Sequence, residues 1–204
     1  MIKALLLMLD PAEAWDRIVR AQRSLHYVLF VFLLPLLGLG ALAEGCGLIW
    51  WGEPQKDFGQ LKRFPMGEAV AYGIGQVLLS IAIVFISAKI IKSVGETFNS
   101  RHSYTQAFTT VAYGLSPLFA LRLFDAFPAV NPWIGWGIGI LLSVKVLYHG
   151  VPRVMLPDPP QAFGLYLISS ILLVAITGLA RFVTAWFLQG RFASVEPIVS
   201  DLVG

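Results

Sequence analysis

The sequence has few of the residues and motifs on which soluble enzymes and secreted domains depend. It contains one cysteine, Cys46, which cannot form an internal disulfide, and only 13% of its residues are charged, against about 25% in a typical soluble domain. The patterns G-x-S-x-G and H-E-x-x-H, the P-loop and the dinucleotide-binding glycines do not occur. The three histidines, His26, His102 and His149, are far apart and lack zinc-ligand spacing. We therefore expect no catalytic residue, no cofactor and no metal ion.

Apolar residues are what the sequence has in abundance. They make up 57% of the chain, and the mean hydropathy is +0.73. The net charge is +3, but the basic residues stand beside apolar runs, and no basic surface interleaved with aromatic residues is evident. Anionic lipid headgroups are therefore the expected partner of these charges, and nucleic acid is not.

Long apolar runs predict five membrane-spanning helices, because about 20 apolar residues cross the hydrocarbon layer. The stretch 1–24 before them contains an amphipathic helix that begins at Asp10-Pro11 and fits either the membrane interface or the protein's own end of the bundle. A short polar tail, residues 189–204, ends the chain. We expect an all-α, polytopic membrane helical bundle with an N-terminal amphipathic interfacial helix. Its transmembrane helices are expected at about 25–43, 69–91, 107–124, 133–148 and 163–188.

Lysine and arginine set the expected orientation, because they are enriched in cytoplasmic connections. Basic residues before the first span and around the ends of the second and fourth outnumber those on the other side. We expect a multi-pass inner-membrane protein with a cytoplasmic N-terminus and a C-terminus outside.

Two arginines fall inside the apolar spans, Arg122 in the third and Arg181 in the fifth. A guanidinium in hydrocarbon needs a carboxylate, carbonyl groups or water. Asp125 is the expected partner of Arg122, because it follows three residues later on the same helix face. Two readings stay open for each arginine: a side chain that reaches the outer headgroups, or part of a polar site that contacts an anion, a lipid headgroup or a solute.

The third span carries Tyr113, Ser116 and Pro117 near its middle. Pro117 is expected to kink the helix and free carbonyl groups one turn earlier. Tyr113 and Ser116 would then line a polar cavity with it. The alternative is a kink that serves packing alone.

Two further sets of residues are candidates for binding lipid or a partner. Lys89 and Lys145 fall near predicted cytoplasmic helix ends, and with Arg153 they predict a basic pocket for anionic lipid; alternatively, the lysines are topology signals that extend to the headgroups. Gly135 and Gly139 lie four residues apart on the fourth span, a small-residue face that lets another helix approach closely.

Three segments resemble those of one known family. Residues 10–18, DPAEAWDRI, are similar to a P-x-x-x-[WF]-x-x-I opening; residues 112–117, AYGLSP, to an aromatic-small-Ser-Pro signature; and residues 147–157, LYHGVPRVMLP, to L-Y-x-G-L-P-x-L-M-K-x-P. On these segments the chain resembles the Yip family, the Ypt/Rab-interacting-protein domain, in its compact prokaryotic branch. Leu156 replaces the lysine of the third motif, and a later K-A pair reads Gln161-Ala162.

The resemblance implies a five-helix bundle with a cytoplasmic N-terminus and no enzymatic activity. Eukaryotic relatives act in vesicle traffic and membrane shaping with small GTPases. Their long N-terminal region is missing from this sequence, so we do not carry GTPase binding over. The expected function is a non-enzymatic, Yip-type integral membrane protein that organises membrane lipids or a partner membrane protein, which includes a second copy of itself. The alternative is a small transporter or channel whose polar path follows the third span through Tyr113, Ser116, Pro117 and Arg122.

Overall fold

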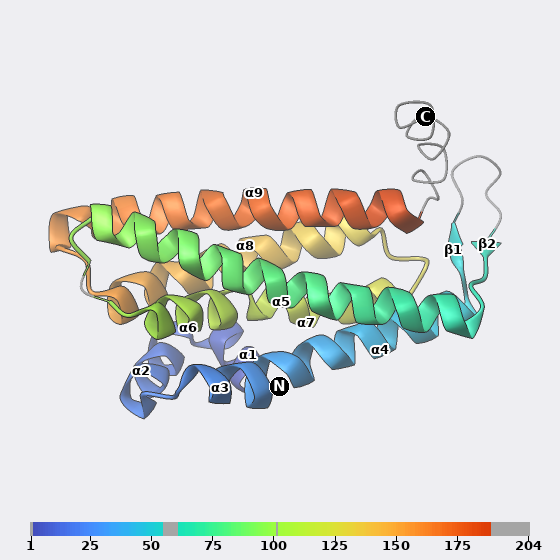
Figure 1. Ribbon diagram of the computed structural model, residues 1–204, viewed down its shortest axis with the longest axis horizontal. Helices are drawn as coiled ribbons and strands as arrows, with labels where there is room; N and C mark the ends of the chain where they lie inside the picture. The colour runs from blue at the N-terminus through green and yellow to red at the C-terminus, as the bar shows by residue number, and fades with distance from the viewer. Residues whose placement is uncertain (1, 55–60, 101, 189–204) are drawn as a thin grey trace, which may run out of the picture.

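The structure is a computed structural model that describes residues 2–54, 61–100 and 102–188. Within these ranges the protein is a bundle of long helices (Figure 1), and two paired two-residue strands, β1 (Glu53–Pro54) and β2 (Leu61–Lys62), lie in a connector at one end. Five helical segments are long and apolar enough to cross a membrane. The predicted fold class, an all-α polytopic membrane bundle, is confirmed.

The spans are built from one to three helical pieces each. The first joins α3 (Leu25–Tyr27), a π-helical segment (Val28–Leu33) and α4 (Leu34–Trp50), and the second is α5 (Met66–Thr97). The third joins α6 (Tyr104–Gly114), α7 (Ser116–Leu121) and a 3₁₀ turn (Arg122–Ala126). The fourth is α8 (Pro132–Met155), and the fifth joins a 3₁₀ turn (Pro159–Gln161) to α9 (Ala162–Leu188).

The first and fourth spans extend further than the sequence predicts. Helix α4 continues from residue 43 to Trp50, and α8 continues from residue 148 to Met155. The prediction ended the first span at residue 43, directly before the carboxylate of Glu44. In the folded protein Glu44 is only 4% exposed and has side-chain partners on other helices, so the helix does not need to end there.

The residues before the first span form two helices, α1 (Ile2–Leu9) and α2 (Pro11–Ala21). Asp10 caps α2 by accepting the N–H of Glu13 at 3.2 Å, and Pro11 occupies the first turn, as the sequence predicts. Both helices lie at the end of the bundle where α6 begins, which we call the N-terminal end; the opposite end, with β1 and β2, is the hairpin end (Figure 1). Helix α1 contacts α7 and α8.

Trp15 anchors α2 on α8. Its side chain is fully buried, and its indole N–H donates to the carbonyl of Val146 at 2.8 Å. A Cβ at Gly150 would overlap the Trp15 ring, so glycine is required for this close approach. The apolar face of α2 is therefore covered by the protein's own end, which was one of the two readings of this helix.

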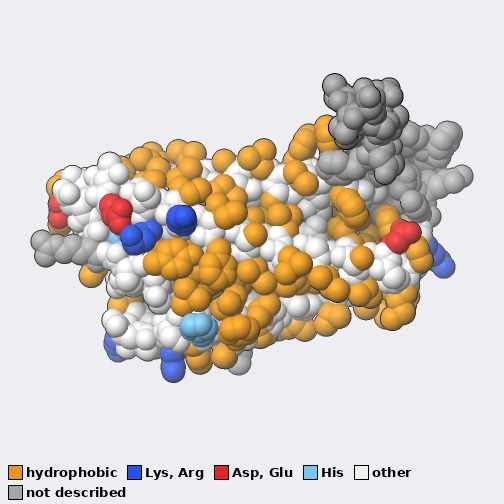
Figure 2. Space-filling model, viewed as in Figure 1, with side chains coloured by type: hydrophobic (Ala, Val, Ile, Leu, Met, Phe, Trp, Pro, Cys, Tyr) orange, Lys and Arg blue, Asp and Glu red, His pale blue; other side chains and the backbone are white. Residues whose placement is uncertain are grey.

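The surface is organised as expected for a membrane protein. In Figure 2, hydrophobic side chains cover the middle of the visible face, and most charged side chains lie toward the two ends. Exposed large apolar residues occur along α4, α5, α8 and α9. In contrast, α6 and α7 are mostly buried, so the third span is the centre around which the others pack.

Candidate functional site

Four charged side chains from three spans lie inside the hairpin half of the bundle. Glu44 comes from α4, Arg122 and Asp125 from the 3₁₀ turn after α7, and Arg181 from α9. We call these four residues the charge cluster. All four belong to segments that are apolar enough to cross a membrane, where ionisable groups are rare and usually mark a function.

Arg122 connects the third span to α4 and α5. Its Nη2 donates to Glu44 Oε2 at 2.6 Å and to Gln76 Oε1 at 3.0 Å, and its Nη1 donates to Ser80 Oγ at 3.3 Å. The prediction that Arg122 pairs with Asp125 is wrong. Glu44 takes the place of Asp125 because α4 brings its carboxylate within reach, while Asp125 is bonded to another arginine.

That other arginine is Arg181. Its Nη1 donates to Asp125 Oδ2 at 2.8 Å, and the two side chains are 12% and 5% exposed. Arg181 therefore turns into the bundle instead of extending toward the outer headgroups. The pair joins residues 56 positions apart, so it connects α9 to the end of the third span.

Neutral polar side chains complete the network. Tyr72 donates its hydroxyl to Glu44 Oε1 at 2.6 Å, and Gln76 Nε2 donates to Thr184 Oγ1 at 3.0 Å. Removing one partner of a buried ion pair typically costs about 3–5 kcal/mol, because the other charge is left unpaired. The charge cluster therefore holds the hairpin halves of α4, α5, α9 and the third span in one arrangement.

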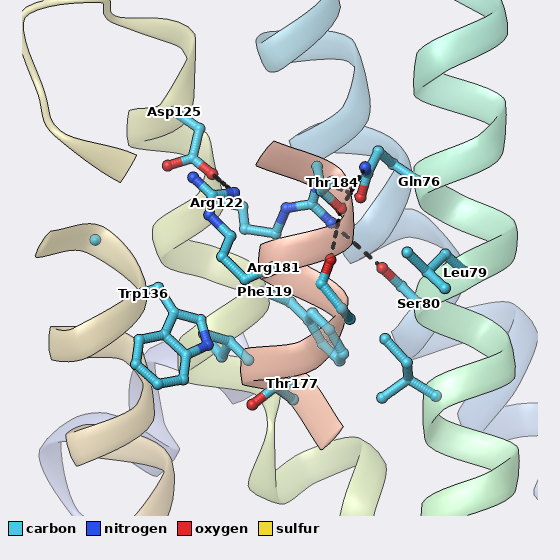
Figure 3. A pocket seen from close by; sticks show the side chains of 14 residues that line it. Gln76, Leu79, Ser80, Phe119, Arg122, Asp125, Trp136, Thr177, Arg181 and Thr184 are labelled. Atoms are coloured by element: carbon cyan, nitrogen blue, oxygen red, sulfur yellow. Dashed lines mark hydrogen bonds and ion pairs between the residues drawn. The ribbon is translucent and has the colours of Figure 1, made fainter. Parts of the chain in front are cut away.

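A small cavity of about 50 Å³ lies beside the charge cluster (Figure 3). Arg122 and Arg181 line it together with Phe119 and Trp136. The Nε of Arg122 and the Nε1 of Trp136 are buried and have no protein acceptor among the described residues. A water molecule needs about 15 Å³ of cavity volume. The cavity is therefore large enough for water molecules and not for a larger solute.

A much larger groove opens between α5 and α9. It has a volume of about 760 Å³, and its walls are mainly apolar. The groove reaches the polar network, because Tyr72, Gln76 and Thr184 line it, and Glu68 lies near its hairpin end. We call it the α5–α9 groove. Its other lining residues are Phe64, Ala71, Gly75, Leu79, Val183, Phe187 and Leu188.

The structure does not bring the predicted third-span residues together around one cavity. Tyr113 is buried between the rings of Phe32 and Trp15, with centroids 4.2 and 6.2 Å away. Ser116 donates to the Tyr113 carbonyl at 2.7 Å, and Pro117 lies in the first turn of α7. None of the three lines the cavity that Arg122 lines.

The glycine face of α8 is covered by the protein itself. A Cβ at Gly139 would lie 2.9 Å from the Cα of Leu118, so α7 approaches α8 closely at this position. Gly135 faces the Asp125 carboxylate, 3.6 Å from where its Cβ would be. At these two glycines the small-residue face therefore packs inside the chain.

The three basic candidates do not converge on one pocket. Lys89 and Lys145 are exposed on α5 and α8. Arg153 donates to Asp16 Oδ1 and to the carbonyl of His149, each at 3.0 Å. A cavity at the N-terminal end includes Arg153 in its lining but neither lysine.

The sequence interpretation missed Glu44, Tyr72, Gln76 and Thr184 as site residues. One signal was available for Glu44. The residues after it, GCGLIW at 45–50, continue the apolar run, which indicates a carboxylate within a span and not after it.

Comparison with known proteins assigns the chain to a family. The chain matches no curated protein and no solved structure at a level of similarity that identifies a relative. The family model of the Yip1 domain matches residues 5–182, which include all five spans up to the last turns of α9. The N-terminal helix opening, the Ser-Pro break of the third span and the end of α8 all lie within this match. The chain therefore belongs to the Yip1 domain family of multi-pass membrane proteins.

Proposed function

We propose that this protein is a non-enzymatic membrane protein that organises lipids, and that it does so by holding a lipid in the α5–α9 groove. The observation that carries this proposal is the shape of the groove. It is a space of about 760 Å³ with apolar walls and a polar floor of Tyr72, Gln76 and Thr184.

The chemistry of the groove suits a lipid chain with its ester region. An acyl chain lies against Leu79, Val183 and Phe187, and it covers polar side chains that would otherwise face bulk hydrocarbon. The charges behind the floor are two arginines and two carboxylates bonded in pairs. The hydroxyl groups of Tyr72 and Thr184 already donate inside the protein. The floor is therefore polar without a net charge, which suits the ester region of a lipid better than an ionic headgroup at this depth.

A small transporter or channel has less support. The two intramembrane arginines are bonded to carboxylates, and the cavity beside them has a volume of only about 50 Å³. The groove opens sideways between α5 and α9, where lipid is the surrounding medium.

The family and the distribution of basic residues support an orientation as well. We place the protein in the inner membrane, with the N-terminus in the cytoplasm and the C-terminus outside. Reporters that are active only in the cytoplasm, fused to either end, test this orientation: activity is expected at the N-terminal fusion and not at the C-terminal one.

Glycine positions allow a sharp test of the groove. Gly75 lines the α5–α9 groove, and a Cβ there meets nothing within 4 Å, so a larger side chain can start at this position and Gly75→Phe is expected to fill part of the groove. Gly38 is an equally open helical glycine in a different groove, between α4 and α5, and Gly38→Phe is the matched control. Native mass spectrometry after gentle extraction is expected to find one bound lipid fewer on Gly75→Phe than on the wild type, and no such loss on Gly38→Phe.

Unchanged lipid retention in Gly75→Phe would overturn the proposal. A diazirine-labelled acyl chain gives a second readout, because it is expected to label peptides of α5 and α9 in the wild type. Labelling of α4 instead would also contradict the assignment.

A further inference from the structure

A second cavity lies at the N-terminal end of the bundle, away from the charge cluster. It has a volume of about 380 Å³ and opens between α2, the start of α6 and the end of α8. This volume is within the range of about 300–1,000 Å³ that is usual for small-molecule sites. The lining includes the apolar side chains of Ile18, Val19 and Val154 together with arginines and hydroxyl groups.

The charge of the lining has one sign. Arg23 and Arg153 both line the cavity, and no carboxylate does so among the residues that the structure describes. Arg153 is bonded to Asp16, which lies outside the lining, but their side chains are 36% and 52% exposed. A pair this exposed contributes little and is readily exchanged. Arg23 is positioned by Tyr27, because its guanidinium carbon lies 4.6 Å from the centre of that ring.

Two serine hydroxyl groups add hydrogen-bond donors. Ser24 caps α3 and accepts the N–H of Tyr27 at 3.4 Å, and Ser103 caps α6 and accepts the N–H of Gln106 at 3.3 Å. A capping hydroxyl uses a lone pair and keeps its own proton for a further acceptor. Both serines line the cavity, as does Thr105 in the first turn of α6, where the helix dipole favours negative charge.

We infer that this cavity binds a phosphate group. Two guanidinium groups, two serine hydroxyl groups and a helix N-terminus offer donors and positive charge to several oxygen atoms at once. The apolar lining residues contact the rest of the molecule when the phosphate belongs to a lipid headgroup. This site is separate from the α5–α9 groove and does not depend on it.

The test compares two phosphate sources on the full chain in nanodiscs. One set contains phosphatidylcholine alone, and the other adds phosphatidic acid; inorganic phosphate is titrated into each. Native mass spectrometry measures retained phosphatidic acid, and the melting temperature measures binding by stabilisation. Retained phosphatidic acid that inorganic phosphate does not displace identifies a lipid headgroup. A melting temperature that rises with inorganic phosphate in phosphatidylcholine alone identifies free phosphate.

Variants show whether this cavity is the site. Arg23→Gln and Arg153→Gln are each expected to weaken binding about tenfold, the usual loss when one charge-assisted hydrogen bond is removed. The matched control is Arg20→Gln, because Arg20 is exposed on α2, three residues before Arg23, and does not line the cavity. Both cavity arginines are at least partly exposed, so the variants are expected to fold, which their melting temperatures without ligand check.

Binding of neither probe by the wild type would overturn the inference, and so would equal binding by all three variants. Gly75→Phe separates this inference from the proposed function. It is expected to empty the α5–α9 groove and to leave phosphate binding unchanged.

Discussion

Ion pairs at the two ends of this bundle have similar lengths but very different surroundings. In the charge cluster, Arg122 and Glu44 are 2.6 Å apart and 17% and 4% exposed. At the N-terminal end, Arg17 and Glu13 are 2.8 Å apart and 54% and 60% exposed. The distance between the charges therefore does not decide how much an ion pair contributes to stability. Its exposure to water does. Buried pairs are costly to break, whereas exposed pairs contribute little and leave their charges available to ligands.

The largest effect on stability is expected when one partner of the buried ion pair is removed. Glu44→Ala leaves the Arg122 guanidinium inside the bundle without a carboxylate and Tyr72 without its acceptor. The free energy of unfolding is expected to fall by about 3–5 kcal/mol, measured by denaturation in detergent. Glu13→Ala, in the exposed pair, is the control and is expected to change stability very little. Equal losses in the two variants would contradict the comparison.

A smaller effect is expected at the N-terminal end, where an uncharged contact fastens α2. Trp15→Phe keeps an aromatic ring but removes the hydrogen bond to the Val146 carbonyl. We expect a loss of about 1 kcal/mol in the free energy of unfolding. Trp50→Phe is the control, because Trp50 is 66% exposed at the end of α4 and is expected to have almost no effect. A loss as large as that of Glu44→Ala would mean that α2 holds the bundle as firmly as the charge cluster does.

The smallest effect is a pH dependence at the same end. Burial lowers the pKa of His102, which lies between α5 and α6, and a hydrogen bond with the backbone of Ser100 opposes this only in part. Its Nε2 is buried without a protein acceptor among the described residues, so protonation there is unfavourable.

The sign of the dependence follows from linkage. Below about pH 6.5 the unfolded chain binds a proton at His102 that the folded protein does not bind. Stability is therefore expected to fall as the pH drops from 6.5 toward the lowered pKa, and to show no dependence on this group above 6.5. Melting temperatures of the wild type and His102→Gln across this range check it: the slope is expected to be smaller in the variant. Identical slopes would show that His102 does not titrate in this range.

The sequence predicts most of the fold, because the relevant signals are local. Apolar runs predict the spans, and Asp10 with Pro11 predicts the start of α2; the structure has both. The division of residues before the first span into α1 and α2 was not predicted. Helix α1 is short, and its place depends on contacts with α7 and α8 that no local pattern reveals.

The candidate site was predicted only in part. Arg122 and Arg181 stand out in the sequence, because an arginine in an apolar run is rare. Their partners do not stand out. Glu44 is 78 residues from Arg122, and Asp125 is 56 residues from Arg181, so only the packing of the spans brings them together. Choosing the nearest carboxylate in sequence gave Arg122 the wrong partner.

The third span has a consequence for how the protein enters the membrane. It is the least apolar of the five spans and the most deeply buried, and it is broken at Leu115 into pieces of 11 and 6 residues before its final turn. Neither piece alone reaches across about 30 Å of hydrocarbon at 1.5 Å per residue. Arg122, near the end of the span, adds a further cost of insertion as long as no carboxylate lies beside it. During biosynthesis the third span is therefore expected to enter the bilayer together with the first two. The first span then supplies Glu44, the carboxylate that pairs with Arg122.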